Sequence, residues 1–298
     1  MTSKSDRAAG LLIGLIVGDK NLGPMHMALM VAESLEKNKK FNKLDIFSSY
    51  LNWFENKGEG SDDTGVVGLK VFKIALESNF NESNNKQDMI KKISKEVDNS
   101  MKGLTGGINP SHRNTPISMS KFISLEELIK FSKEECKMTH QSIYAEEAAT
   151  VSNLICRLNI EGEMNFQEIL QFLLENYKFE KLIEDALKTP SLKFKPRLDL
   201  GGFSPKTLET VLCFVEKYTK SIDFKKLNDD QRKAVFRECM EMSFKFSGKP
   251  NYSPVLVGSI LGSIVGISGI PSDMYSHSPC ILRALEVSKK LSNDWKEE

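Results

Sequence analysis

The chain carries near its start Arg7-Ala-Ala-Gly-Leu-Leu-Ile-Gly-Leu-Ile-Val-Gly18, an almost wholly apolar stretch that decides the fold. Its glycines recur at positions 10, 14 and 18, so one face of a helix here would carry no side chains. A second helix can approach such a face closely. The segment Val255 to Ile267 repeats this spacing with glycines at positions 258, 262 and 266. We therefore expect two buried helices, one from each end of the chain, to pack together at the centre.

The rest of the chain also reads as helices, since apolar residues recur at helical spacing and no convincing strand alternation occurs. The expected helices are Met25–Glu36, Leu44–Phe54, Val66–Ala75, Met89–Val97, one opened by the Ser124–Glu127 capping box, Ile143–Leu158, one from an Asn165 cap to Tyr177, Lys206–Tyr218 behind a Ser204 cap, Asp229–Phe246 and a final one within residues 273–292. No shift in composition marks a boundary. The sequence thus predicts an all-α chain with a single domain over residues 1–298.

The composition excludes several classes of function. The 41 lysines and arginines against 40 aspartates and glutamates leave a net charge of +1, which favours neither nucleic acid nor an anionic membrane as a partner. The five cysteines are scattered without a CxxC spacing, so we expect reduced core thiols in an intracellular, cytoplasmic protein. The apolar run from Gly10 to Val17 is too short to span a bilayer, and we expect no signal peptide or transmembrane segment.

An acidic motif, Gly58-Glu-Gly-Ser-Asp-Asp-Thr-Gly65, precedes the helix that starts near Val66. Ser61, Asp62, Asp63 and Thr64 are four consecutive hard oxygen ligands of the kind that Mg²⁺ binds. Two adjacent acids also suit the positive N-terminal end of a helix. A metal site and a doubly acidic helix cap therefore both remain open.

Two further features carry polar groups. Asp19 ends the first apolar helix, where a carboxylate needs a partner or an ion. Residues 101–119 are rich in Gly, Asn, Pro and hydroxyls and are expected to form a loop with His112 and Arg113 at its centre. Such loops can bind anions, although an ordinary surface loop is the alternative. We expect His140 to be structural, and His26 and His277 to lie on the surface.

Four motifs occur in a fixed order along nearly the whole chain. They are the glycine-spaced helix ending in Asp19, Ser61-Asp62-Asp63-Thr64, Gly201-Gly202-Phe203 with the Ser204-Pro205 helix start, and the last glycine helix ending at Ile270-Pro271. Together they resemble the ADP-ribosylglycohydrolase family. The Asn-Pro-x-His-Arg and Pro-Asn-Tyr-x-Pro segments are similar to a divergent branch of it, near the J-crystallins and selenoprotein J.

This resemblance implies a compact orthogonal bundle of helices that cleaves the N- or O-glycosidic bond between ADP-ribose and a protein or small acceptor. It implies metal ligands at Ser61, Asp62 and Asp63, and a carboxylate of Asp19, Asp62 or Asp63 that activates water. The implied substrate-binding residues are Gly106, Gly107, Asn109, His112 and Arg113 for the diphosphate and ribose, Gly201, Gly202 and Phe203 against the nucleotide, and Lys249 and Asn251 near the second acidic motif.

The second acidic motif is where the chain departs from the family pattern Gly-Gly-Asp-x-Asp-Thr. Lys249 and Asn251 stand at the two aspartate positions, and Tyr252 stands at the threonine. A charged ammonium group cannot coordinate Mg²⁺ and repels it. Lys249 either replaces one ion and contacts a phosphate, or the site is dead and the lysine forms a structural salt bridge. We expect at most one Mg²⁺ ion, with none as the alternative.

Three functions follow as alternatives. The first is a hydrolase of ADP-ribosyl or related nucleotide-sugar bonds, acting on an ADP-ribose-type small molecule or an ADP-ribosylated protein. The second is an inactive protein that binds ADP-ribose or a nucleotide, and the third is a structural, crystallin-like protein. The retained Asp62–Asp63 pair argues against the third, because twin acids contribute nothing to packing. The altered second motif argues against a standard form of the first.

Overall fold

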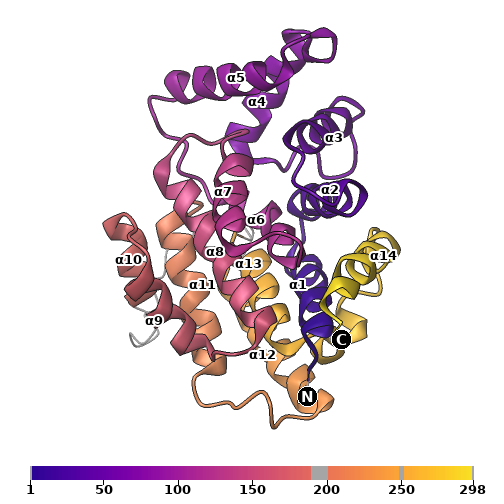
Figure 1. Ribbon diagram of the computed structural model, residues 1–298, viewed down its shortest axis with the longest axis vertical. Helices are drawn as coiled ribbons and strands as arrows, with labels where there is room; N and C mark the ends of the chain where they lie inside the picture. Colours follow the sequence, from indigo (N-terminus) through magenta and orange to yellow (C-terminus); the bar gives the residue numbers. More distant parts are fainter. Residues whose placement is uncertain (1, 189–200, 248–251, 297–298) are drawn as a thin grey trace.

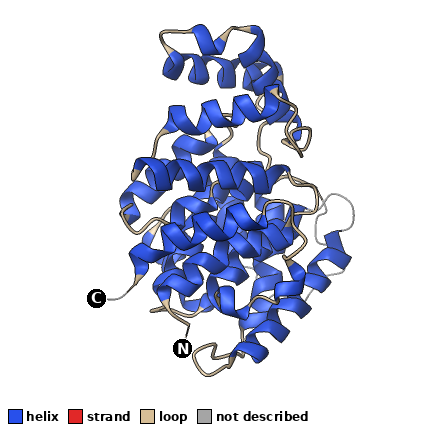
Figure 2. Ribbon diagram, turned by 90° about the vertical axis from the view of Figure 1, so that its right-hand side faces the viewer, coloured by secondary structure: helices blue, strands red, loops and turns tan. Residues whose placement is uncertain are grey.

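The structure is a computed structural model that describes residues 2–188, 201–247 and 252–296. These residues form fourteen α-helices and five short 3₁₀ helices, with no strand among them (Figures 1 and 2). The all-α prediction is confirmed. The α-helices are α1 Lys4–Gly18, α2 Gly23–Asn38, α3 Lys43–Glu55, α4 Gly65–Glu77, α5 Lys86–Ser100, α6 Asn109–Arg113, α7 Leu125–Cys136, α8 Ile143–Glu161, α9 Phe166–Asn176, α10 Lys181–Lys188, α11 Ser204–Thr219, α12 Asp229–Ser247, α13 Tyr252–Val265 and α14 Ile281–Ser292.

Helices α1 and α13 pack together at the centre, as their glycine spacing predicted (Figure 1). A Cβ atom on Gly14 would lie 2.0 Å from the carbonyl oxygen of Gly258, and one on Gly10 would lie 2.3 Å from that of Gly262. The two backbones thus touch where any side chain would separate them. Residues 8–18 of α1 are all buried. This contact joins the two ends of the chain into one core.

Helix α8 is the second central element, and residues 145–160 along it are buried without exception. It packs against α7, α11 and α13. Near its end, the guanidinium of Arg157 donates hydrogen bonds to the carbonyls of Ser118, Ser120 and Ile123 at 2.7–2.9 Å. Three satisfied carbonyls offset the cost of burying this charge. Helices α3, α4 and α5 extend away from this core at the top of Figure 1.

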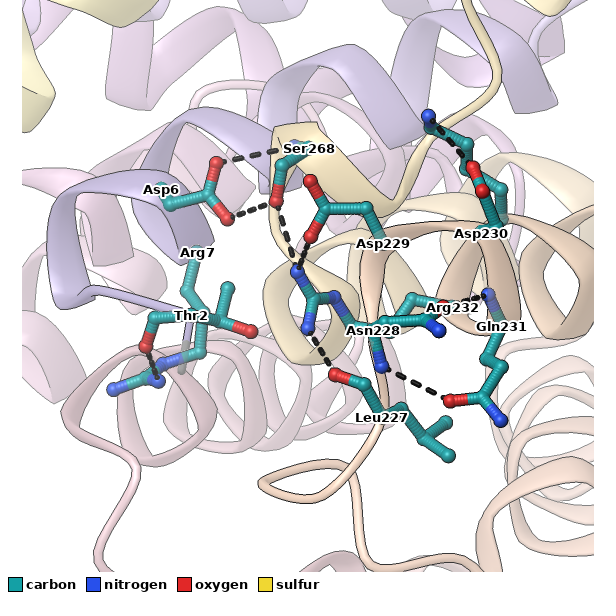
Figure 3. Close-up of polar contacts among 11 residues, drawn as sticks. Thr2, Asp6, Arg7, Leu227, Asn228, Asp229, Asp230, Gln231, Arg232 and Ser268 are labelled. Atoms are coloured by element: carbon teal, nitrogen blue, oxygen red, sulfur yellow. Dashed lines mark hydrogen bonds and ion pairs between the residues drawn. The ribbon is translucent and has the colours of Figure 1, made fainter.

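The start of α1 is tied to the start of α12 by polar contacts around a cavity of about 680 Å³ (Figure 3). The Asp6 carboxylate accepts hydrogen bonds from the backbone N–H and hydroxyl of Ser268, at 3.1 and 2.7 Å. The Arg232 guanidinium donates to the Ser268 hydroxyl, to the Leu227 carbonyl and to Asp229. These groups bind one another, so the cluster fastens the N-terminal helix to the bundle.

Several local predictions are confirmed and several are wrong. The capping boxes Ser124–Glu127 and Asn165–Glu168 both form as expected. Residues 101–119 are not wholly a loop, because they contain α6 and a 3₁₀ helix, Thr115–Met119. Helix α11 begins at Ser204, with Phe203 rather than Ser204 at the N-cap. Helix α10 was not predicted. No helix of the described residues combines the length and apolar character that a bilayer crossing demands.

Candidate functional site

Four helices of eight or more residues begin around the segment 105–113. Asn109 packs against Gly65 at the start of α4, where a Cβ would lie 2.9 Å from its Oδ1 atom. Ser142, the N-cap of α8, donates its backbone N–H to the Thr105 hydroxyl at 3.2 Å. Helices α11 and α13 begin beside the same segment. Helix N-termini carry partial positive charge, so their convergence favours an anionic group here.

The segment 106–108 pairs directly with residues 202–204. The Ile108 N–H donates to the Gly202 carbonyl and the Ser204 N–H donates to the Gly106 carbonyl, both at 2.9 Å. Gly107 and Phe203 form the bridge between the two segments. Gly201, which precedes them, is exposed and accepts a hydrogen bond from the Thr207 hydroxyl. The structure therefore brings together two loops that lie about a hundred residues apart and were both expected to bind substrate; that role stays a prediction.

Asp19 is the C-cap of α1 and is 7% exposed. One carboxylate oxygen accepts from the backbone N–H groups of Asn21 and Leu22, and the other accepts from Met25 at 2.7 Å. Met25 lies in the first turn of α2, whose own N-cap residue makes no side-chain hydrogen bond. Asp19 thereby caps α2. Burial raises its pKa, while these three hydrogen bonds lower it.

Asp63 lies beside Asp19, in the loop that precedes α4. Its pKa is raised to about 6, because burial and then the charges of Asp19 and Asp62 raise it more than a hydrogen bond with the Asn21 side chain lowers it. Asp62 itself is exposed, and Ser61 is half-buried. The structure thus places the three predicted catalytic carboxylates in one neighbourhood, where the pKa of Asp63 is raised towards neutral pH.

The doubly acidic cap, the alternative interpretation of this motif, is wrong. Helix α4 begins at Gly65, its N-cap is Thr64, and its first turn carries no acid. The Asp62 and Asp63 side chains precede this cap. They need another explanation.

We tested whether this acidic neighbourhood fits Mg²⁺. Its oxygens are of the hard type that Mg²⁺ prefers. Within residues 2–188, 201–247 and 252–296, however, no three side chains of His, Cys, Asp or Glu assemble around one point that could hold a metal ion. Asp19 is already engaged by three backbone N–H groups. The Thr64 hydroxyl, the fourth oxygen of the acidic motif, is 1% exposed and has no hydrogen-bond partner among the described residues.

His112 and Arg113 are both buried, although the sequence placed them at the centre of a loop. The pKa of His112 is lowered to about 4, because burial and the Arg113 charge lower it more than a hydrogen bond with the Tyr252 backbone raises it. Its imidazole is therefore neutral at pH 7, and its Nε2 atom has no partner among the described residues. His112 thus links the segment 105–113 to the first residue of α13.

Arg113 is part of an internal ion pair. Its Nε atom lies 2.7 Å from Oε1 of Glu135, and the two side chains are 1% and 0% exposed. Its guanidinium also donates to the Thr139 hydroxyl, and the Tyr50 hydroxyl donates to Glu135. This gives Arg113 a structural role that the sequence did not reveal. His140, expected to be structural, is buried and hydrogen-bonded to Thr139 through Nδ1.

An aromatic pair borders the bridged loops. The rings of Phe203 and Tyr144 meet edge to face with centroids 5.5 Å apart, and Phe203 is 39% exposed. A Cβ on Gly106 would lie 3.1 Å from the Phe203 ring. Sequence reasoning missed Tyr144, because a single aromatic residue at a helix start carries no signal of its own. Lys249 and Asn251, the two remaining expected site residues, lie outside the described residues.

The comparisons with known proteins agree with this architecture. The family model described as ADP-ribosylglycohydrolase matches residues 24–293. A solved structure described as "ADP-ribosylglycohydrolase-related protein complex" superposes with a TM-score of 0.72 over 99% of this chain and 100% of that chain, at 16% identity. Such low identity shows the fold alone. No curated protein sequence matches the chain. Because the family model covers most of its length, this chain belongs to the ADP-ribosylglycohydrolase family.

Proposed function

We propose that this protein hydrolyses a glycosidic bond between ADP-ribose, or a related nucleotide sugar, and its acceptor. The observation that carries the proposal is the junction of the 106–108 and 202–204 loops, with Asn109 set against the start of α4. This junction brings one expected nucleotide loop onto the other and sets both beside the helix that follows Asp62 and Asp63. A chain that kept only its core would not need this arrangement.

The substrate diphosphate would lie along Gly106, Gly107 and Asn109. The N-termini of α4, α8, α11 and α13 supply the positive potential that a diphosphate requires. Phe203, partly exposed beside Tyr144, offers an apolar ring for the nucleotide base. Gly201 and Gly202 carry no side chain that would obstruct this approach. Neutral His112 would hold the segment 105–113 against α13 through its hydrogen bond with the Tyr252 backbone.

Asp63 would act as the general base. A water molecule attacks the anomeric carbon while the Asp63 carboxylate takes a proton from it. The bond from that carbon to the acceptor nitrogen or oxygen breaks, and the acceptor leaves with the electron pair and takes up a proton from solvent water. A carboxylate whose pKa is about 6 is ionised at neutral pH and yet a stronger base than an ordinary aspartate. Burial raises the pKa of Asp63, and the charges of Asp19 and Asp62 also raise it, because they repel a further negative charge beside them.

We propose at most one Mg²⁺ ion, held by Ser61, Asp62 and Asp63, with Lys249 and Asn251 taking the place of the second acidic motif. Such an ion would polarise an oxygen of the ribose or of the leaving group. Because the described carboxylates do not assemble a three-ligand site, every step above is assigned to the chain's own residues.

A second candidate is a nucleotide-binding protein without turnover. The commitment of both Asp19 oxygens to the cap of α2 favours it, since that carboxylate has little freedom to act on water. The two candidates share the binding loops. They differ in whether Asp63 receives a proton from water.

Release of free ADP-ribose separates these candidates. The chain would be incubated with ADP-ribosylated arginine, with an ADP-ribosylated serine peptide and with small O-linked conjugates, each with Mg²⁺ and with a chelator. We expect release, and a loss of about a hundredfold or more in Asp63→Asn. Asp230→Asn, whose side chain is 93% exposed on α12, is the matched control and should retain full activity.

Thermal stabilisation by ADP-ribose provides the second measurement. Stabilisation of both the native protein and Asp63→Asn, with no release from any conjugate, would establish the binding protein instead. No stabilisation of the native protein by ADP-ribose in either metal condition would overturn both candidates.

A further inference from the structure

The thiol of Cys280 and the imidazole of His26 lie together beside Glu59, near the start of the loop that carries Asp62 and Asp63. The Cys280 sulfur is 3.5 Å from Nε2 and 3.7 Å from Nδ1 of His26. The two side chains come from α14 and α2, 254 residues apart. His26 is 8% exposed, so the expectation of a surface histidine is wrong. The pair is a candidate nucleophile with its base.

The surroundings of this pair match those of reactive cysteines. Cys280 is the N-cap of α14, so it lies at the positive end of a twelve-residue helix, although its thiol makes no capping hydrogen bond. Burial raises the pKa of Cys280, Arg283 one turn along the helix lowers it, and Glu59 and Glu33 raise it. Oε2 of Glu59 lies 3.8 Å from Nε2 of His26, so the Glu59 charge can stabilise the imidazole ring when the ring takes up a proton. Burial lowers the pKa of His26. Before any reaction the pair therefore consists of a thiol and a neutral imidazole.

The other four cysteines provide an internal reference. Cys136, Cys156 and Cys239 are 0% exposed. Cys213 is 6% exposed against 7% for Cys280, so the two residues are buried to a similar extent. The pKa of Cys213 is raised to about 11, mainly by burial and also by its charged neighbours Glu209 and Glu216. Cys213 is therefore as buried as Cys280 and also has acids nearby, but it lacks the imidazole and the arginine that lie beside Cys280.

We propose that Cys280 is a modification site, a thiol that His26 activates towards peroxides. As His26 takes the thiol proton, the sulfur attacks one oxygen of the peroxide. A sulfur–oxygen bond forms, the oxygen–oxygen bond breaks, and the departing oxygen takes the proton from His26. The sulfur is oxidised by two electrons to a sulfenic acid, and hydrogen peroxide is reduced to water.

The position of the pair connects such a modification to the acidic loop. His26 stacks on Trp53 with ring centroids 5.8 Å apart. Trp53 in turn donates its indole N–H to the Glu59 carbonyl at 3.1 Å, and its ring fills the space beside Gly58. We expect an oxygen added to the sulfur to displace the His26 ring, which stacks on Trp53. Trp53 in turn contacts Gly58 and Glu59, the first residues of the loop that carries Asp62 and Asp63. Trp53 fluorescence therefore reports the event.

The test is a comparison of two cysteines within one molecule. The native protein is treated with hydrogen peroxide, sulfenic acids are trapped with a cyclic 1,3-dione, and the peptides are quantified by mass spectrometry. We expect Cys280 to be trapped at least about tenfold faster than Cys213. Equal rates at the two sites would overturn the proposal, and this comparison needs no variant to fold.

A variant then isolates the base. His26→Phe keeps an aromatic ring on Trp53 and removes both nitrogens, so trapping at Cys280 should fall to the Cys213 rate. An unchanged Cys280 rate in His26→Phe would overturn the role of His26. In a Trp295→Phe background, where Trp53 alone emits, peroxide should change the emission of the native sequence and not that of Cys280→Ser. The same emission change in Cys280→Ser would show that the loop responds to another oxidation.

Discussion

At the scale of single residues, Asp63 is a group whose ionisation opposes folding. Its carboxylate is partly buried beside two other acids, and its pKa is about 6 against an ordinary value of 3.8. Ionisation therefore costs more in the folded than in the unfolded protein. Residues that oppose folding in this way are typical of functional sites.

Asp63→Asn should therefore stabilise the protein at alkaline pH. Folding raises this pKa from 3.8 to about 6. The free-energy cost of ionising Asp63 is therefore absent well below the lower value, grows between the two values and is complete above the higher one. About two units correspond to about 3 kcal/mol, which partial exposure to solvent reduces to about 1 kcal/mol. Urea unfolding in the presence of a chelator, at pH 4 and pH 8, measures the difference. An equal loss of stability at both values would contradict this origin.

The candidate site was only partly predictable from residue identities. Asp62 and Asp63 were found because two adjacent acids are conspicuous in sequence. The engagement of Asp19 with three backbone N–H groups was not, since it depends on how the chain turns after α1. His26 was assigned to the surface because its partner Cys280 is 254 residues away. Local sequence reveals a residue's own chemistry and conceals its distant partners.

At the scale of elements, the glycine spacing of α1 and α13 specified their contact. Three small residues at intervals of four can serve only a close approach, and the pattern occurs in both helices. Helix α10, by contrast, is eight residues long and carries no cap signal. The short helix α6 lies in a segment rich in glycine and proline, where propensity indicates a loop. Long periodic helices were predictable, and short ones held by tertiary contacts were not.

Gly14→Ala tests the close approach of α1 and α13. The added methyl group would lie 2.0 Å from the Gly258 carbonyl oxygen, so the helices must separate. We expect a loss of about 3 kcal/mol in the free energy of unfolding. Alanine is intrinsically better than glycine in a helix by about 1 kcal/mol, so propensity would act in the opposite direction.

Gly103→Ala is the matched control for this substitution. No atom lies within 4 Å of its Cβ position, and its φ of +77° makes backbone strain the sole cost. That strain is about 1 kcal/mol. Chemical denaturation of both variants gives the comparison. A loss in Gly14→Ala no larger than that in Gly103→Ala would show that the core can relax around a side chain.

At the scale of the whole molecule, one buried charge cluster joins α3 and α7 to α6, which itself contacts α13 of the glycine core. Glu135 at the end of α7 binds Arg113 of α6 and Tyr50 of α3. It thus connects α3, which belongs to the upper part of Figure 1, with the helices around the candidate site. Oε2 of Glu135 and one terminal nitrogen of Arg113 have no partner among the described residues. Burial of this cluster therefore costs free energy. Removal of one partner costs more, because it leaves the other charge buried and unpaired.

Substitution of either partner separates the structural role of Arg113 from the phosphate-binding role that the sequence suggested. Arg113→Met or Glu135→Leu alone should reduce the free energy of unfolding by about 3–5 kcal/mol, because each leaves a buried charge unpaired. The double variant should recover most of that loss, since an apolar pair removes both charges. Calorimetric titration with ADP-ribose then decides the role. A double variant that binds ADP-ribose as tightly as the native protein places Arg113 in the framework. A stable double variant with binding weakened more than tenfold would place its guanidinium on the substrate instead.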